Sequence, residues 1–467
     1  IIFGGIITGL SYYTWVPGFL AWIGFIPFLY VLLNDDGSFS FYKGYLFGII
    51  YNLIAFYWIG LNSGASYFIA ILSLIAAVSY LSLYWGILAF LICRIKDKCK
   101  KLLTFPLLIV LLEWFRSLGS LGFPWANIAL TQIEFLPLIQ IMDYTGTYGV
   151  SALVCLFNVI IYYCFFGKSI IKKSFFFSLF IIFFIFNWYL GVKKINYFNN
   201  YVETFDVAVI QPNIDPNLKW EIKNRENIVS YLDSLYDIAI GLKPSLILFP
   251  ETAYPTYLKF DNRLRNYIQK KVNQSEIFTL IGTVDKVSTV DNVNKYYNSS
   301  ILFSKNKNIQ VYNKIHLVPF AEYVPLSDKF SFLSKMNFGQ GNFSNGKEIL
   351  NFDLNGIRIG NLICYESSIP SLISEFVNSG ANILTIQTND GWLGKSQGPY
   401  QHYNIAKIRA IENRVPIVRS GNTGISGLIL PNGRSIHETS LEINSVFKVS
   451  VPLLKPGSFY SHYGNIF

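Results

Sequence analysis

The chain has 467 residues, of which 52% are hydrophobic and only 14% are charged, and its mean hydropathy is +0.37. This average is too apolar for an ordinary soluble enzyme. The formal net charge of +10 does not indicate nucleic-acid binding, because basic residues form short clusters beside apolar segments, as they do in membrane proteins.

The N-terminal part, residues 1–193, is predicted to be a transmembrane bundle of about seven helices. Several of its apolar runs approach the roughly 20 residues needed to cross a bilayer core. No polar face interrupts these runs, which argues against buried helices of a large soluble domain. The predicted segments lie near residues 1–16, 18–33, 45–61, 66–93, 102–116, 145–166 and 174–192.

Two basic clusters predict the orientation of this bundle. One occupies residues 94–101 and the other consists of the lysines within 168–173. Lys and Arg are retained on the cytoplasmic side, so the seventh helix should end on the opposite face. Residues 203–453 are therefore predicted to lie outside the cytoplasm, although Lys193 and Lys194 argue the other way.

Residues 203–453 are predicted to form a layered α/β domain, because short β-branched runs alternate there with stretches of helical spacing. The predicted strands are 205–211, 245–249, 278–282, 357–363, 381–386 and 416–419. The predicted helices are 221–241, 262–274, 369–379 and 399–414.

Cys364 is the only cysteine of this α/β region. It follows the predicted strand 357–363 and precedes a predicted helix near residue 369, a junction that favours a thiolate and an oxyanion. A lone thiol accompanied by a base and a cation fits thioester chemistry. The alternative is a structural buried cysteine. We interpret the other four cysteines of the chain as such structural residues, because they lie in or beside apolar segments. They are Cys93, Cys99, Cys155 and Cys164.

Glu251 and Lys314 are the candidate base and cation. Glu251 follows the apolar strand 245–249 on a proline-containing turn, where poor solvation raises the pKa of a carboxylate toward the range of a general base. Lys314 lies between Asn313 and His316. The alternatives are a surface acid at a strand end and a solvated loop lysine.

Together, Glu251, Lys314 and Cys364 resemble the Glu-Lys-Cys triad of the nitrilase superfamily. Nearly the whole chain resembles the apolipoprotein N-acyltransferases, the membrane-bound branch of that superfamily. The segments that carry the resemblance are 113–117 (EWFRS), 122–125 (GFPW), 211–214 (QPNI), 218–220 (LKW), 312–325 (YNKIHLVPFAEYVP), 364–366 (CYE), 388–394 (TNDGWLG) and 398–402 (GPYQH).

The resemblance implies a polytopic α-helical membrane bundle that carries a nitrilase-like αββα sandwich on the outer side of the bacterial cytoplasmic (inner) membrane. Residues 454–467 would then approach a further transmembrane helix that lies beyond this sequence. The implied reaction moves an acyl chain from the sn-1 position of a phospholipid, through a Cys364 thioester, to the N-terminal α-amine of a diacylated apolipoprotein.

The resemblance also implies roles for four supporting residues. Glu322 and Glu366 would be further acids that orient the lysine and polarise the site. Trp220 and Tyr365 would position the lipid or substrate. Packing and surface charge remain the alternatives for all four.

No cofactor and no metal are expected. His316 and His402 are two of only four histidines and lack an acidic partner at ligand spacing. The expected partners are a phospholipid donor and a diacylated lipoprotein acceptor, with no nucleic acid.

Two other functions remain open. A membrane-tethered carbon-nitrogen hydrolase would use the same triad and release the acyl group to water. A transporter with an accessory domain would need ionisable residues along a path through the membrane. The bundle offers few such residues, namely Glu113, Arg116 and Asp143.

Overall fold

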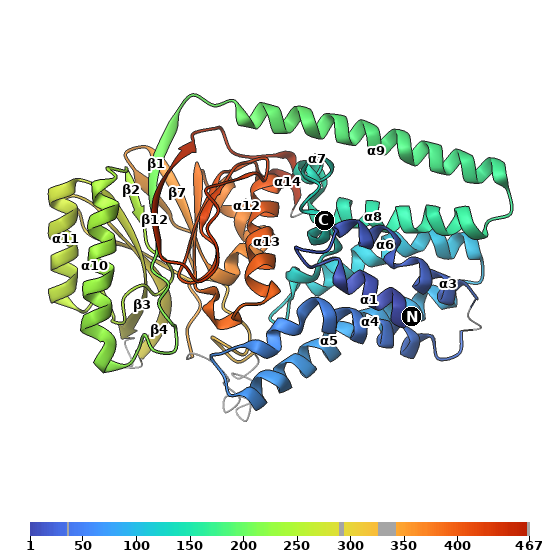
Figure 1. Cartoon of the computed structure of the whole chain (residues 1–467), viewed down its shortest axis with the longest axis horizontal. Helices are drawn as coiled ribbons and strands as arrows, with labels where there is room; N and C mark the ends of the chain where they lie inside the picture. Colours follow the sequence, from blue (N-terminus) through green and yellow to red (C-terminus); the bar gives the residue numbers. More distant parts are fainter. Residues whose placement is uncertain (35–36, 289–293, 326–341, 465–467) are drawn as a thin grey trace. The chain divides into compact units, whose positions relative to one another are not determined.

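The computed structural model describes residues 1–34, 37–288, 294–325 and 342–464, which divide into two compact units (Figure 1). The helical unit contains Ile1–Asn62, Ser66–Tyr197 and Ser396–Ile408. The α/β unit contains Ser63–Ala65, Phe198–Lys395 and Arg409–Phe467.

Four helices of the helical unit are long and apolar enough to cross a membrane, counted over the residues that the structure describes. They are α4 with its following turn (Ser40–Leu61), α5 (Tyr67–Arg94), α8 (Met142–Phe166) and α9 (Ile170–Asn199). The other helices are α1 (Ile2–Leu10), α2 (Ala21–Gly24), α3 (Ile26–Asn34), α6 (Lys98–Arg116) and α7 (Leu136–Ile139).

Three of the seven predicted apolar segments correspond to these other helices. α1 has nine residues, and the apolar stretch Gly18–Asn34 is shorter than a full span. The segment 102–116 lies in α6, whose first turn carries three lysines. A crossing by these three segments stays a prediction.

Helices α4 and α5 pack closely because small residues lie between them. A Cβ atom on Gly44 would lie 2.2 Å from the carbonyl oxygen of Trp85, so only glycine permits this approach. The space around this contact is filled by rings: Phe47 stacks on Phe28 with centroids 4.2 Å apart and meets Trp85 edge-on at 5.0 Å.

The first turns of α13 (Gln397–Asn413) also belong to the helical unit, which the sequence analysis does not anticipate. The side chain of Gln401 accepts hydrogen bonds from the indole nitrogens of Trp58 and Trp125, at 3.1 and 3.2 Å. Its amide donates to the carbonyl oxygen of Ala55 at 3.0 Å. The glutamine therefore satisfies three polar groups that would otherwise be buried without partners.

The α/β unit contains two six-stranded sheets, in the orders β12-β1-β2-β3-β4-β5 and β11-β10-β9-β8-β7-β6. Helices α10 and α11 cover the outer face of the first sheet, and α12 and the end of α13 cover that of the second (Figure 1). This arrangement confirms the predicted αββα sandwich. The helices are α10 (Arg225–Gly241), α11 (Asn262–Ser275), α12 (Pro370–Asn378) and α14 (Phe459–Tyr463).

All six predicted strands are present, and the structure adds six more. The predicted ones are β1 (Thr204–Gln211), β2 (Leu246–Leu248), β3 (Phe278–Ser288), β7 (Ile357–Ile363), β8 (Ile383–Thr388) and β9 (Ile417–Gly421). The added ones are β4 (Asn294–Phe303), β5 (Gln310–Asn313), β6 (Asn351–Leu354), β10 (Gly427–Ile429), β11 (Ser435–Ile436) and β12 (Ser445–Pro452).

The interface between the two sheets is partly polar, which explains why β4 escaped prediction. Its buried residue Ser300 accepts a hydrogen bond from Asn361 of β7 at 2.9 Å and bonds to Gln387 of β8. Gln387 in turn donates to the carbonyl oxygen of Phe249 at 2.6 Å. Polar residues thus occupy positions where a strand pattern would lead one to expect apolar ones.

Candidate active site

Cys364 lies at the end of β7, where the strand turns into the short 3₁₀ helix Cys364–Ser368. Its φ angle is +52°, a left-handed conformation that is unusual for a residue other than glycine. The residue as a whole is partly exposed, although its thiol is buried. A strained turn that presents a side chain at the carboxyl edge of a sheet is typical of a nucleophile.

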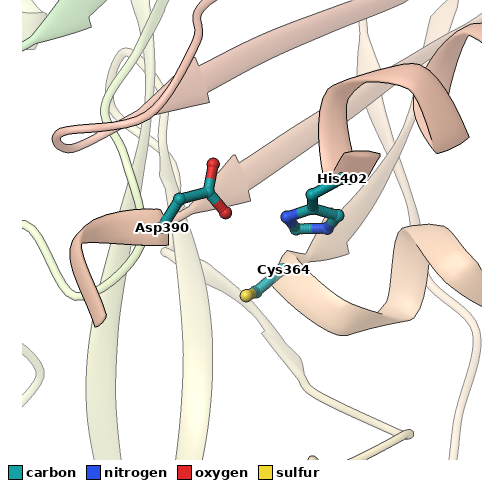
Figure 2. A group of neighbouring side chains, drawn as sticks. All are labelled: Cys364, Asp390 and His402. Carbon is teal, nitrogen blue, oxygen red and sulfur yellow. The ribbon is translucent and has the colours of Figure 1, made fainter. Parts of the chain in front are cut away.

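Figure 2 shows Cys364 and Asp390 at the ends of the neighbouring strands β7 and β8. The sulfur lies within 4.8 Å of a carboxylate oxygen of Asp390. His402, also labelled there, belongs to the helical unit. The strands pair in parallel with Ile363 opposite Gln387, so the next residue pair is Cys364 and Thr388.

Glu251, Lys314 and Glu322 form one buried cluster. The ammonium nitrogen of Lys314 lies 2.9 Å from the carboxylate of Glu322 and 3.7 Å from Oε1 of Glu251. The amide of Asn298 bridges the two carboxylates, donating to Glu251 at 2.7 Å and to Glu322 at 2.9 Å. Glu322 also accepts the backbone N–H of Val318 at 2.8 Å. The solvated-lysine alternative is therefore excluded, because Lys314 is 1% exposed.

The electrostatics of the cluster keep Lys314 charged. Burial by itself lowers the pKa of this ammonium, but Glu322, Glu251 and Cys364 together raise it above its usual range. Burial raises the pKa of Glu251, and the charges of Glu322 and Asp390 add to this effect, while Lys314 and the hydrogen bond from Asn298 oppose it. The predicted rise in the pKa of Glu251 is present.

The thiol does not have the environment that the sequence predicted. Burial raises the pKa of Cys364, the charges of Glu251 and Asp390 raise it further, and Lys314 and a side-chain hydrogen bond with Thr388 only partly oppose them. The resting group at neutral pH is therefore a thiol. A base must remove its proton when it reacts, and the strand-to-helix junction alone does not provide a thiolate.

Glu366 joins the lysine segment to the nucleophile strand. Its Oε1 accepts the Tyr312 hydroxyl at 2.9 Å and the backbone N–H groups of Ile315 and His316 at 2.6 and 3.1 Å. Its Oε2 accepts the N–H of Ile363 at 2.8 Å. Burial, only partly offset by these donors, raises the pKa of Glu366 to about 7. Glu322, in contrast, contacts the lysine directly.

Trp220 and Tyr365 differ in exposure. Trp220 is 46% exposed on the turn that precedes α10. Tyr365 follows the nucleophile directly and is partly buried. The roles of Trp220 and Tyr365 remain predictions.

A further set of residues beside the thiol was not singled out from the sequence. Asp390 accepts hydrogen bonds from the Thr388 hydroxyl at 3.0 Å and from the buried guanidinium of Arg419 at 2.8 Å. Thr388 and Asp390 lie in the segment TNDGWLG, which the sequence analysis named only as part of the family resemblance. Thiol and carboxylate are metal-ligand types, but both oxygens of Asp390 already have these protein donors.

Two family models match the chain. The apolipoprotein N-acyltransferase N-terminal domain matches residues 4–160, and the carbon-nitrogen hydrolase domain matches residues 206–453. The second match covers all of the site residues described above, from Trp220 to Arg419.

Similar proteins extend over the full chain. An apolipoprotein N-acyltransferase of Geobacter metallireducens is 34% identical over 100% of this chain and 91% of its own length. One of Chlorobaculum tepidum is 30% identical over 100% of this chain and 92% of its own length.

Solved structures match the α/β part of the chain. A carbon-nitrogen hydrolase from Helicobacter pylori G27 has a TM-score of 0.42 and 14% identity, over 54% of this chain and 90% of that one. Saccharomyces cerevisiae Nit3, a member of branch 10 of the nitrilase superfamily, has a TM-score of 0.41 and 17% identity, over 57% of this chain and 95% of that one.

Proposed function

Because the chain belongs to the apolipoprotein N-acyltransferase family, we propose that it transfers an acyl chain from a membrane phospholipid to the N-terminal α-amine of diacylglyceryl-cysteine on apolipoproteins. The proposed route passes through a thioester on Cys364. One observation carries this route: a buried ammonium, Lys314, lies between two carboxylates, and its charge acts on the Cys364 thiol.

The first half-reaction forms the thioester. Glu251 takes the proton of Cys364, and the sulfur attacks the carbonyl carbon of the sn-1 ester. Negative charge develops on the carbonyl oxygen of the ester, where the ammonium of Lys314 and a backbone N–H near Tyr365 stabilise it. The C–O bond then breaks, and Glu251 returns the proton to the leaving lysophospholipid oxygen.

The second half-reaction consumes the thioester. The α-amine of the diacylglyceryl-cysteine attacks the thioester carbonyl, and Glu251 accepts the proton that the nitrogen loses. The C–S bond breaks, the sulfur recovers a proton from Glu251, and the amide remains on the lipoprotein. The raised pKa of Glu251 suits both steps, because the carboxyl must bind and release a proton near neutral pH.

The helical unit gives this reaction its place. Both substrates are anchored by acyl chains, and moving such a chain into water costs about 0.8 kcal/mol per CH₂ group. The four apolar helices fit a multi-pass bacterial membrane protein, in which a membrane-bound site avoids that cost.

We propose that the α/β domain lies outside the cytoplasm. Two contacts support the prediction that both basic clusters, residues 94–101 and 168–173, lie at the same end of the helical unit. Lys98 donates to Asn34 at the end of α3, at 2.9 Å, and Phe166 at the end of α8 meets Tyr30 of α3, with ring centroids 5.2 Å apart. Basic loops at one end fit the cytoplasmic side. Lys194, which argues against this orientation, forms an ion pair with Asp143 at 2.7 Å.

The 30 residues of α9 support the same orientation. A helix of that length reaches about 45 Å, enough to cross a bilayer from the basic end to the start of the α/β domain.

The test is mass spectrometry of the Cys364 peptide after incubation with a phospholipid that carries a labelled sn-1 chain. We expect the acyl label on Cys364, and its transfer to a diacylated lipopeptide added afterwards. Cys364→Ser should carry no such thioester, whereas Cys99→Ser, which changes an exposed cysteine, should behave as wild type. Absence of label on Cys364 in the wild type would rule out the route.

Carbon-nitrogen hydrolysis is the second candidate, because the residues 206–453 match the hydrolase domain. The same experiment separates the two functions. Persistent label on Cys364 without an acceptor supports transfer, and rapid release of free fatty acid supports hydrolysis.

A further inference from the structure

Lys219 is a buried cation that the mechanism above does not use. Its side chain is 1% exposed, and its ammonium has no hydrogen-bond partner among the residues that the structure describes. Its neighbours on the same turn, Leu218 and Trp220, are 49% and 46% exposed. The turn therefore directs the ammonium of Lys219 inward, which is costly unless a nearby charge compensates it.

The turn is fixed to the edge of the sheet that carries the candidate site. The backbone N–H of Ile214 donates to the side chain of Asn422 at 3.0 Å, and the amide of Asn422 donates back to the carbonyl oxygen of Ile214 at 2.7 Å. Asn422 also donates to Asn389, at 3.0 Å, the residue before Asp390. The N–H of Lys219 closes the turn on the carbonyl oxygen of Asp215 at 3.1 Å.

The turn follows β1, which pairs in parallel with β2, so the turn and Glu251, which follows β2, leave the same edge of the first sheet. The buried carboxylates of the site differ in their donors. Asp390 is bound by Arg419, and Glu366 by four donors. Glu251 accepts the neutral amide of Asn298 at 2.7 Å, but it lies 3.7 Å from an ammonium that Glu322 already binds at 2.9 Å. Two carboxylates thus share one lysine, which leaves the cluster one positive charge short.

We infer that Lys219 is a positioning residue that supplies the missing counter-charge to Glu251 and keeps this carboxylate ionised until it takes the proton of Cys364. The inference rests on the proposed function only in the role of Glu251 as the base. It adds a second cation to a site in which the family resemblance implied one.

The titration of Lys219 agrees with this role. Burial lowers its pKa to about 8, and the attraction of Glu251 opposes the shift. Its ammonium is therefore mostly charged at neutral pH. The other groups facing Glu251 are Lys314, Glu322, Asp390 and the amide of Asn298. Because several groups act on this carboxylate, the contribution of Lys219 should be modest but measurable.

The test measures how fast iodoacetamide alkylates Cys364 in the full-length protein, in detergent, between pH 5.5 and 9. Mass spectrometry reads the Cys364 peptide, and the exposed Cys99 in the same sample is the internal reference. Lys219→Met should move the acid limb of the profile up by about 0.5 to 1 pH unit, which slows alkylation about three- to tenfold there. Lys219→Arg, which keeps the charge, should retain the wild-type limb.

Two further variants make the result specific. Lys223→Met removes an exposed lysine four residues away and should leave the profile unchanged. Glu251→Gln should slow Cys364 alkylation, because it removes the base. If Glu251→Gln has no effect, the proposed base and with it the proposed function fail.

If Glu251→Gln slows alkylation but Lys219→Met matches the wild type, the inference on Lys219 alone is overturned. The inference is also overturned if the pH profile of Lys219→Arg is shifted as far as that of Lys219→Met, because the charge of the side chain would then not be the cause.

Discussion

Glu322→Gln isolates the contact on which the buried cluster depends. The substitution preserves the shape of the side chain and replaces a carboxylate by a neutral amide, beside an ammonium at 2.9 Å. Removing one partner of a buried ion pair costs about 3 to 5 kcal/mol. Glutamine can still accept a hydrogen bond from Lys314, so we expect the lower end, about 3 kcal/mol of unfolding free energy.

The same substitution should also slow catalysis. Lys314 would then rely on Glu251, which is now 3.7 Å away, and a closer ammonium makes that carboxylate a weaker base. We expect acylation of Cys364 to be slowed about tenfold or more, beyond any loss of folded protein.

Calorimetry of the full-length protein and the rate of label uptake by Cys364 measure the two effects. A loss of 3 kcal/mol corresponds to a fall in Tm of about 6 to 12 °C for a domain of this size. Glu276→Gln is the matched control, because it removes one carboxylate from the exposed pair with Lys305, which is worth about 0 to 1 kcal/mol. If Glu322→Gln behaves like Glu276→Gln in both assays, the reasoning is wrong.

Three other substitutions test the neighbouring groups. Thr388→Val should raise the pKa of the Cys364 thiol and slow its alkylation, because the side-chain hydrogen bond between Thr388 and the thiol, which lowers this pKa, is lost; Thr388→Ser should retain the wild-type rate. Gly282→Ala places a Cβ atom 2.4 Å from the carbonyl oxygen of Pro250 and 2.7 Å from Cα of Glu251, so the backbone must shift and acylation should fall about tenfold or more. Burial raises the pKa of Glu366 to about 7, well above its ordinary value, so the protonated form favours folding, and this stability is lost as pH rises through 7. Between pH 5.5 and 8, the wild type should lose about 2 kcal/mol of unfolding free energy through Glu366, and Glu366→Gln should not. The Tm of the variant should therefore depend less steeply on pH.

Each of these predictions has an outcome that contradicts it. Equal alkylation of the Val and Ser variants would show that the Thr388 hydroxyl does not act on the sulfur. Gly241→Ala, where a Cβ atom meets nothing within 4 Å, is the control for Gly282, and equal activity of the two variants would refute the steric argument. A Glu366→Gln variant with the pH dependence of the wild type would exclude Glu366 as its source.

The sequence by itself determined the division into an apolar helical part and an α/β part, because hydropathy and strand periodicity are local properties. It also located the six strands with apolar patterns, including β7, whose bounds Ile357–Ile363 match the predicted range. Glu251 and Cys364 could be selected because each follows a predicted apolar strand, whereas Lys314 was selected from its flanking residues and the family resemblance. The two strands belong to different sheets, so only the folded structure brings their ends into one site.

Only the tertiary structure decided the electrostatics of the site. The pKa of Cys364 depends on charges that lie more than 20 residues away in the chain, at Glu251, Lys314 and Asp390, and no local pattern reports their distances. For this reason the sequence predicted a thiolate where the structure favours a thiol. It also assigned Glu322 and Glu366 one role, although the first binds the lysine and the second binds backbone N–H groups.

The sequence analysis missed strand β4 and the place of the first turns of α13 for the same reason, because both depend on contacts between distant segments. The residues Ser300 and Gln401 are buried among partners from distant segments, and their polarity is compensated only after the chain has folded. The burial of Lys219 likewise cannot be read from a turn whose neighbours are exposed. Hydrophobic pattern is encoded residue by residue, whereas the pairing of buried polar groups is a property of the folded arrangement.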